Sequence, residues 1–325
     1  REVDRINFLC TGSEANDLAL RIANFETGGT GIVVTELAYH GGTMAVADMS
    51  PSLGTGVGDH VRVVAAPSAY RRGESGLAEA FARDVAAAFE DLSNNGHNPS
   101  VFIFDTIFSS DGVLSGPVGF LKPAVEAARE AGAIVIADEV QPGFGRTGSH
   151  FWGFERHGIV PDILTMGKPM GAGHPISGLA AKAGLLEGFG QHSRYFNTFG
   201  GNAVSCAVAQ AVLDVIVDEG LQANAKRVGK HLLDGLDELS KDHEIIGDVR
   251  GAGLFIGVDL VKDRATKSYA ADETAHIVSE LRKRKILISR SGLGGNCLKI
   301  RPPLPFSISN ADQFLDELNS VLAVV

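Results

Sequence analysis

The chain has 325 residues, of which 44% are hydrophobic and 21% are charged, as is usual for a soluble globular enzyme with one large and one smaller domain. Its formal net charge of -10 argues against nucleic acid and anionic membranes as partners, because both attract basic surfaces. No apolar run is long enough to cross a membrane, and no signal-peptide pattern opens the chain.

The first two thirds of the chain alternate short apolar runs with helix-like stretches. Apolar runs that end in glycine-rich turns are typical of buried parallel strands. Seven such runs are INFLC, GIVVTE, VRVVAAP, VFIFDT, AIVIADE, DILTMG and GLAAKAG. Helices are expected from Glu14 onward, around Leu77–Leu92 and around Phe120–Ala131. This alternation predicts an α/β domain with a mostly parallel, doubly wound sheet covered by helices on both faces.

From Gly201 the pattern changes to longer helices and shorter strands. The stretch NAVSCAVAQAVLDVIVDEG and the charged stretch after it, through about Leu239, predict helices. DVRGAGLFIGVDLV, a helix near Ala271–Arg284, KILISRS, CLKIRPPL and a C-terminal helix follow. This pattern predicts a smaller α+β domain, so we place the large domain at residues 1–219 and the small domain at residues 220–325.

A short polar turn, Thr11-Gly12-Ser13, joins the first strand to the first helix. Backbone N–H groups at a helix N-terminus, together with the helix dipole, form a ready site for a phosphate dianion. The alternative is that Ser13 only caps the helix.

Two predicted strands end in residues of opposite charge. The run AIVIA ends in Asp138 and Glu139, and the run DILTM ends close to Lys168. In open α/β sheets the carboxyl ends of the strands line the ligand crevice. An acid and an amine there suit pyridoxal phosphate, whose aldehyde forms a Schiff base with a lysine and whose pyridinium nitrogen needs a carboxylate. Taken singly, Lys168 would be a solvated loop residue and Asp138 a helix cap.

The segment 143–148 satisfies the G-x-G-x-x-G pattern of dinucleotide binding, which should open a helix directly after its strand. Several residues separate strand and glycines here, and SHFWGFERHG is not a convincing amphipathic helix. A nicotinamide (NAD)-dependent dehydrogenase is therefore only a distant alternative. Cys10, Cys206 and Cys297 are few, far apart and have no metal-binding spacing, so we expect buried thiols in a reducing cytoplasm and no metal site.

Four motifs together resemble one enzyme family: TGSEAN near the start, DEVQPGFGRTG, TMGKPMGAGHP, and LKIRPPLPFS near the end. In this order and spacing they are similar to the class III aminotransferases, which are pyridoxal-phosphate enzymes of fold type I. TMGKPMGAGHP and IRPPLPFS are most similar to the subgroup of alanine–glyoxylate aminotransferase 2 and ethanolamine-phosphate phospho-lyase. The resemblance implies fold type I and pyridoxal 5'-phosphate as the cofactor.

The resemblance also assigns residues to the phosphate and to one face of the cofactor ring. Gly12 and Ser13 match the positions that bind the phosphate. Tyr39, in YHGG, matches the aromatic residue that packs on the pyridine ring. His40 is either a second contact to the ring or a packed structural histidine.

The other implied contacts come from the two charged strand ends. Asp138 would hold the pyridine nitrogen protonated, and Gln141 would hydrogen-bond the phenolic oxygen. Lys168 would carry the cofactor and then act as the base that moves the substrate proton, so Lys168 and Asp138 are the expected catalytic residues. Glu139 and Arg146 belong to the same motif, and we expect them to have a structural role, either as an ion pair or as a brace for the loop.

Thr198, in NTFGGN, matches the residue that reaches the phosphate of a neighbouring subunit, which implies a homodimer with shared sites. Two departures affect the substrate. Asp105 stands where many members have a Glu-Pro-x-x-Gln stretch, whose acid gates a substrate-binding arginine. Lys299 holds the carboxylate-binding position, and Arg301 follows on the same face of the predicted strand, either to bind the carboxylate or to brace Asp105 or the proline loop.

We therefore expect a transaminase that moves an amino group from an amine, amino acid or ω-amino acid to a 2-oxo acid such as pyruvate or glyoxylate. The alternative on the same cofactor is a phospho-lyase acting on an amino-alcohol phosphate. Family members carry a segment before this chain's first strand, and we expect that segment of the substrate pocket to be absent. A catalytically silent fragment that binds the cofactor is a further alternative.

Overall fold

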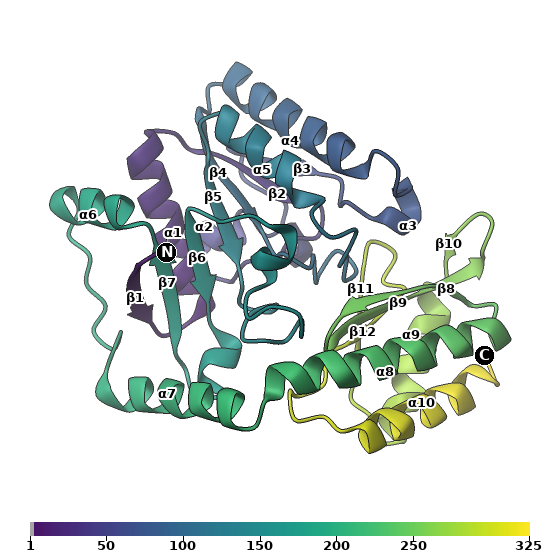
Figure 1. The fold of residues 1–325 in the computed structure, drawn as a ribbon. Helices are drawn as coiled ribbons and strands as arrows, with labels where there is room; N and C mark the ends of the chain where they lie inside the picture. Colours follow the sequence, from purple (N-terminus) through teal and green to yellow (C-terminus); the bar gives the residue numbers. More distant parts are fainter. Residues whose placement is uncertain (1–2) are drawn as a thin grey trace.

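The computed structural model describes residues 3–325 and has two domains (Figure 1). The large domain contains a seven-stranded sheet in which five neighbouring strands are parallel, β7 is antiparallel to β6, and β1 is antiparallel to β7. The strand order is β1 (Arg5–Leu9), β7 (Ser177–Ala181), β6 (Ile163–Met166), β5 (Ile134–Asp138), β4 (Pro99–Phe104), β2 (Gly31–Thr35) and β3 (Val61–Val64). The predicted mostly parallel α/β sheet is confirmed.

Helices cover both faces of this sheet, and its inner strands are accordingly buried along most of their length. Every residue of β2 and β6 is buried. One face packs against α1 (Gly12–Thr27), and the other packs against α4 (Leu77–Asn94) and α5 (Leu121–Glu130). Burial on two faces explains why these strands read as unbroken apolar runs in the sequence.

The small domain is an antiparallel sheet covered by three helices. Its strand order is β10-β9-β12-β11, and β8 pairs with β9. The elements are β8 (Ile246–Ala252), β9 (Phe255–Asp263), β10 (Ser268–Tyr269), β11 (Ser289–Ser291), β12 (Cys297–Ile300), α8 (Leu221–Asp242), α9 (Ala271–Lys283) and α10 (Ile308–Leu322). Apolar side chains of α8, α9 and α10 form one core with the sheet. Within KILISRS the strand β11 covers only the last three residues, so it follows the apolar residues 286–288 and does not include them. Cys297 on β12 is buried as expected, whereas Cys10 and Cys206 are only partly buried.

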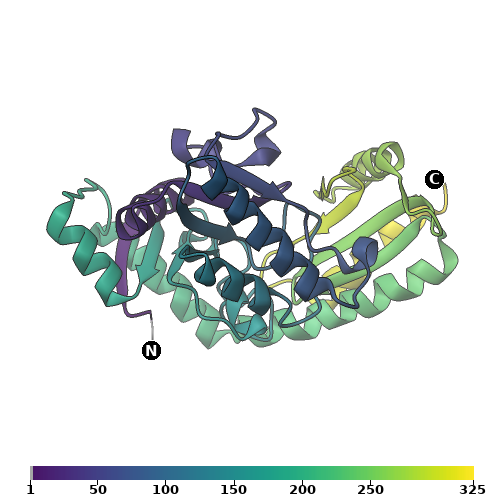
Figure 2. The ribbon, with the colours of Figure 1, turned by 90° about the horizontal axis from the view of Figure 1, so that it is seen from above.

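Two helices connect the domains. α7 (Ala203–Asp218) and α8 follow one another along one side of the molecule, and Gly220 between them has a φ of 60° (Figure 2). α6 (Ala183–His192) precedes them and was not predicted. Within residues 3–325, no helix is long and apolar enough to span a membrane.

Candidate active site at the carboxyl edge of the large sheet

A cavity of about 170 Å³ lies at the carboxyl ends of β4, β5 and β6, and it has roughly ten times the volume that one water molecule requires. Its lining residues are Gly12, Ser13, Tyr39, His40, Gly41, Asp105, Asp138, Val140, Gln141 and Lys168. Seven of the eight residues that the sequence assigns to cofactor binding meet here. Thr198 is the exception.

The N-terminus of α1 forms one wall of the cavity. Thr11 caps the helix in a capping box with Glu14, in which the Thr11 side chain accepts from the Glu14 N–H. The proposed Ser13 cap is therefore wrong, because the helix begins two residues earlier than expected. The Ser13 hydroxyl instead accepts a hydrogen bond of 3.0 Å from the Gly42 N–H. Gly12 and Ser13 thus lie in the first turn, where backbone N–H groups are free for an anion.

Asp138 lies at the end of β5 and is buried with its carboxylate held from two sides. Its Oδ2 atom accepts hydrogen bonds of 3.0 Å from Asn16 Nδ2 and 2.8 Å from His40 Nδ1. Asn16 is itself oriented, because its Oδ1 atom accepts from the Thr165 hydroxyl at 2.7 Å. Asn16 and Thr165 were not predicted as site residues. The only indication in the sequence was that Asn16, a polar amide, stands among the apolar residues of the buried face of α1.

Gln141 joins the cavity to two neighbouring segments. Its Nε2 atom donates to Ser109 Oγ at 2.6 Å, and its Oε1 atom accepts from Arg301 at 3.2 Å. Asp105, at the end of β4, accepts from the backbone N–H groups of Ile107 and Ser109, both at 2.9 Å. Burial raises the pKa of Asp105. Arg301 therefore contacts Gln141 and does not brace Asp105.

Lys168 begins a single 3₁₀ turn, η3 (Lys168–Gly171), directly after β6. Its side chain lines the cavity and is exposed there. Within residues 3–325 its amine has no ion pair or hydrogen bond. The unpaired amine of Lys168 and the fixed carboxylate of Asp138 therefore line one cavity at two strand ends, which is where the sequence predicts them.

Two further cations lie beside this cavity. Lys299 on β12 is only 7% exposed, and its ammonium lies 5.5 Å from the centre of the Phe255 ring. Burial lowers the pKa of Lys299 to about 8. Arg301 follows the end of β12, so it does not lie within the strand as expected. Both residues line two cavities of about 640 and 740 Å³, and neither forms an ion pair within the described part of the chain.

Thr198 lies on an exposed loop and does not line the cavity. Its neighbours Phe196 and Phe199 are 76% and 68% exposed, and Val204 on α7 is 67% exposed. Apolar side chains with such exposure mark a surface that another protein chain can cover.

Two of the three glycines of the segment 143–148, Gly145 and Gly148, contact α8, whereas Gly143 lies against Trp152. A Cβ atom at Gly148 would lie 2.6 Å from Lys226 Cα, and one at Gly145 would lie 3.0 Å from Gln222 Cβ. These glycines let the loop lie against the small domain, and they leave no room for a pyrophosphate. The dinucleotide pattern is therefore a packing feature.

Glu139 and Arg146 brace this loop, as expected, but within residues 3–325 they do not form an ion pair with each other. Glu139 is buried and accepts hydrogen bonds from the Thr106 hydroxyl and from the backbone N–H groups of Gly153 and Phe154. Arg146 donates to two carbonyl oxygens that lie beyond α8 in the sequence, those of Leu254 and Pro302. Neither side chain lines the cavity.

The sequence profile of one family, aminotransferase class-III, matches residues 1–322. The chain belongs to the class III aminotransferases. It is 40% identical to an alanine–glyoxylate aminotransferase 2 homolog 2, mitochondrial, from Arabidopsis thaliana, with 96% of this chain and 65% of that protein aligned. It is 37% identical to an alanine–glyoxylate aminotransferase 2-like protein from Drosophila melanogaster, over 98% of this chain and 67% of that protein. This chain thus spans about two thirds of these curated relatives.

A solved structure of a phospholyase from Arthrobacter in complex with phosphoethanolamine is also similar to this class III aminotransferase. The two chains superpose with a TM-score of 0.96 at 41% identity, over 100% of this chain and 78% of the other. The predicted fold type I architecture is confirmed by this match.

Class III aminotransferases use pyridoxal phosphate, and the residues of the cavity fit that cofactor. Lys168 supplies an unpaired amine, Asp138 supplies a buried carboxylate, and the first turn of α1 supplies backbone donors. The buried Nε2 atom of His40 has no hydrogen-bond partner, which is unusual for a polar atom unless a ligand or water completes it.

Proposed function

We propose that this protein is a pyridoxal-phosphate-dependent transaminase that moves an amino group from an amine, amino acid or ω-amino acid to a 2-oxo acid. The observation that carries the proposal is that Lys168 and Asp138 line one cavity. Asp138 is the last residue of β5, and Lys168 follows the neighbouring parallel strand β6. The similarity to the aminotransferases of Arabidopsis and Drosophila supports it. The partners are therefore a small-molecule amino donor and a 2-oxo acid acceptor.

The bound cofactor supplies an electron-withdrawing ring and an aldehyde that exchanges amines. Lys168 would bond covalently to that aldehyde and, after an amine substrate displaces it, move the proton from the substrate Cα. Asp138, fixed by Asn16 and His40, would keep the ring nitrogen protonated, because a nearby carboxylate favours the charged form. Tyr39 would cover one face of the ring and exclude water.

An absorption spectrum and a panel of amino donors test this function. The purified full-length protein should carry a visible cofactor band that shifts when an amine is added, and it should release the keto product of a matching donor. A band that does not respond to any amine would indicate a silent cofactor-binding protein and would contradict the proposal.

A second candidate is a phospho-lyase that removes phosphate from an amino-alcohol phosphate. Lys299 and Arg301 lie side by side without a carboxylate partner, and two cations suit a phosphate dianion. The similar Arthrobacter structure is a phospholyase. Release of inorganic phosphate from phosphoethanolamine, without any requirement for a 2-oxo acid, would favour the lyase.

We also propose a homodimer in which Thr198 reaches the phosphate site of the partner subunit. The exposed Phe196, Phe199 and Val204 beside Thr198 support an interface at this surface. Light scattering of the holoenzyme should give twice the mass of one chain, and a fully active monomer would refute the proposal. A cytoplasmic location is our remaining proposal, and fluorescence of the tagged full-length protein in its own cell tests it.

A further inference from the structure

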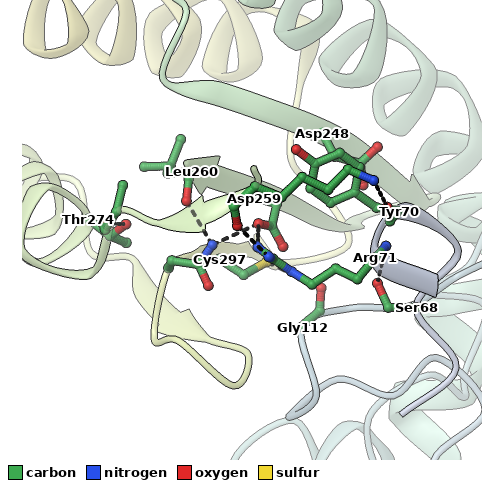
Figure 3. Close-up of polar contacts among 12 residues, drawn as sticks. Ser68, Tyr70, Arg71, Gly112, Asp248, Asp259, Leu260, Thr274 and Cys297 are labelled. Atoms are coloured by element: carbon green, nitrogen blue, oxygen red, sulfur yellow. Dashed lines mark hydrogen bonds and ion pairs between the residues drawn. The ribbon is translucent and has the colours of Figure 1, made fainter. Parts of the chain in front are cut away.

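A partly buried cluster of charged side chains joins the two domains (Figure 3). At its centre Asp259 on β9 is 5% exposed and accepts from three donors. These are Arg71 at 2.6 Å, Asn296 at 2.7 Å and Arg250 at 3.2 Å. Arg71 belongs to α3 (Ala69–Arg72) of the large domain, whereas Arg250 lies on β8 of the small domain.

Arg250 also holds the backbone of a large-domain loop. Its guanidinium donates to the Gly112 carbonyl at 2.6 Å and 3.2 Å, and to the Val113 carbonyl at 3.1 Å. Asp248 accepts from its remaining nitrogen at 2.5 Å. The planar fork of arginine is therefore shared between two acids and two carbonyl groups, which is a geometry that lysine cannot reproduce.

The loop that Arg250 grips is strained. Phe108 and Val113 have φ values of 48° and 61°, in the left-handed region that residues with a Cβ atom avoid. Both side chains are buried. Such conformations persist only where the surroundings hold them, and they are common beside functional sites.

The same loop carries groups of the cofactor cavity. It begins at Asp105, which lines the cavity and accepts the Ser109 N–H. The Ser109 hydroxyl accepts the hydrogen bond of Gln141, which also lines the cavity. A shift of the loop backbone at Gly112 would therefore also move Ser109, and with it the Gln141 side chain that is hydrogen-bonded to Ser109.

We propose that Arg250 is a positioning residue for the cofactor cavity: from the small domain it holds the strained loop 105–113, and through Ser109 it orients Gln141. The inference rests on the proposed function only in assigning the cofactor to this cavity. It makes the affinity for the cofactor depend on a contact between the domains.

Two matched variants test the inference, R250K and R71K. Each variant keeps a cation at Asp259 and loses the arginine fork. Within residues 3–325, Arg71 forms no hydrogen bond with the loop 105–113, since its guanidinium donates to Lys267 and Asp259. Both should lower the melting temperature. Only R250K should speed hydrogen exchange of the loop amides, and only R250K should raise the dissociation constant of pyridoxal phosphate, by about tenfold, the equivalent of about one lost hydrogen bond.

Equal effects of R250K and R71K on loop exchange and cofactor affinity would overturn the inference and leave Arg250 a purely structural residue. If R250K does not fold, D248N replaces it. Within residues 3–325, the Asp248 side chain forms a hydrogen bond and ion pair with Arg250 alone. D248N should show the same pattern at smaller size, and unchanged loop exchange would overturn the inference. If the wild-type protein binds no pyridoxal phosphate, the proposed function fails, while the exchange comparison still tests the grip of Arg250 on the loop.

Discussion

Asp138 and His40 share a buried hydrogen bond of 2.8 Å between Oδ2 and Nδ1. The same Oδ2 atom accepts from Asn16, whereas among the described residues 3–325 Oδ1 accepts only from the Val140 N–H, at 3.1 Å. The carboxylate is thus held in one orientation before any ligand binds. A preorganised charge of this kind acts on a developing transition state without having to reorient.

Asp138→Asn should keep most of the affinity for the cofactor and slow the amine half-reaction on the order of a thousandfold. An amide cannot keep the ring nitrogen protonated. Single-turnover kinetics with a saturating amine, together with the cofactor dissociation constant, separate the two effects. Near wild-type turnover in the Asn variant would show that Asp138 does not have this role.

Lys168 should be the only lysine that borohydride reduction links to the cofactor, because its amine is unpaired and faces the cavity. Peptide mapping after reduction checks this prediction. The critical comparison is Lys299, whose lowered pKa of about 8 makes its amine the nearest competitor. Lys299→Ala should keep the label and Lys168→Ala should lose it, and a label on Lys299 would contradict the assignment.

Arg301→Ala should raise KM for 2-oxo acids by about ten- to a hundredfold, the usual worth of one charged hydrogen bond. The half-reaction with an amine that lacks a carboxylate should be spared. Arg290→Ala is the matched control, because Arg290 lines the same outer cavity but, in the part of the chain that the structure describes, its guanidinium donates only to the Ala271 carbonyl. If Arg301→Ala and Lys299→Ala both leave KM unchanged, the acceptor carboxylate binds elsewhere.

Binding of an anionic substrate should weaken as the pH rises through about 8. Burial lowers the pKa of Lys299 from its usual 10.5 to about 8, so the ammonium is charged below that pH and neutral above it. KM for a 2-oxo acid should therefore rise between pH 7 and pH 9, by roughly tenfold at most. Lys299→Arg should flatten this rise, because arginine stays protonated. An identical pH profile in that variant would place the titrating group elsewhere.

The large sheet and the position of Asp138 and Lys168 at two neighbouring strand ends can be predicted from the sequence, because both depend on local patterns. Strands buried on two faces are unbroken apolar runs, and their carboxyl ends must share an edge. The bond from His40 to Asp138 joins residues 98 positions apart. No period in the sequence specifies such a contact, because it depends on how α1 and the loop after β2 pack together.

The same limit applies to the substrate side of the site. The spacing of Lys299 and Arg301 places them together, but the sequence alone does not reveal that β12 ends at Ile300 and that Arg301 turns to Gln141. Likewise the glycines of the segment 143–148 have a pattern known from nucleotide binding. Only the position of α8 reveals that they serve packing.

That packing makes a joint in which backbone lies directly on backbone. Across the domain boundary, a Cβ atom at Gly253 would lie 2.4 Å from the Arg146 carbonyl oxygen. Gly253 in turn lies against α8 of its own domain, where a Cβ atom at Gly229 would lie 2.1 Å from the Gly253 carbonyl oxygen. At this contact no side chain separates the two domains. Unfolding of one domain would therefore expose the packed surface of the other to solvent. The chain should therefore melt as one cooperative unit, with a single calorimetric peak, although each domain has hydrophobic clusters of its own.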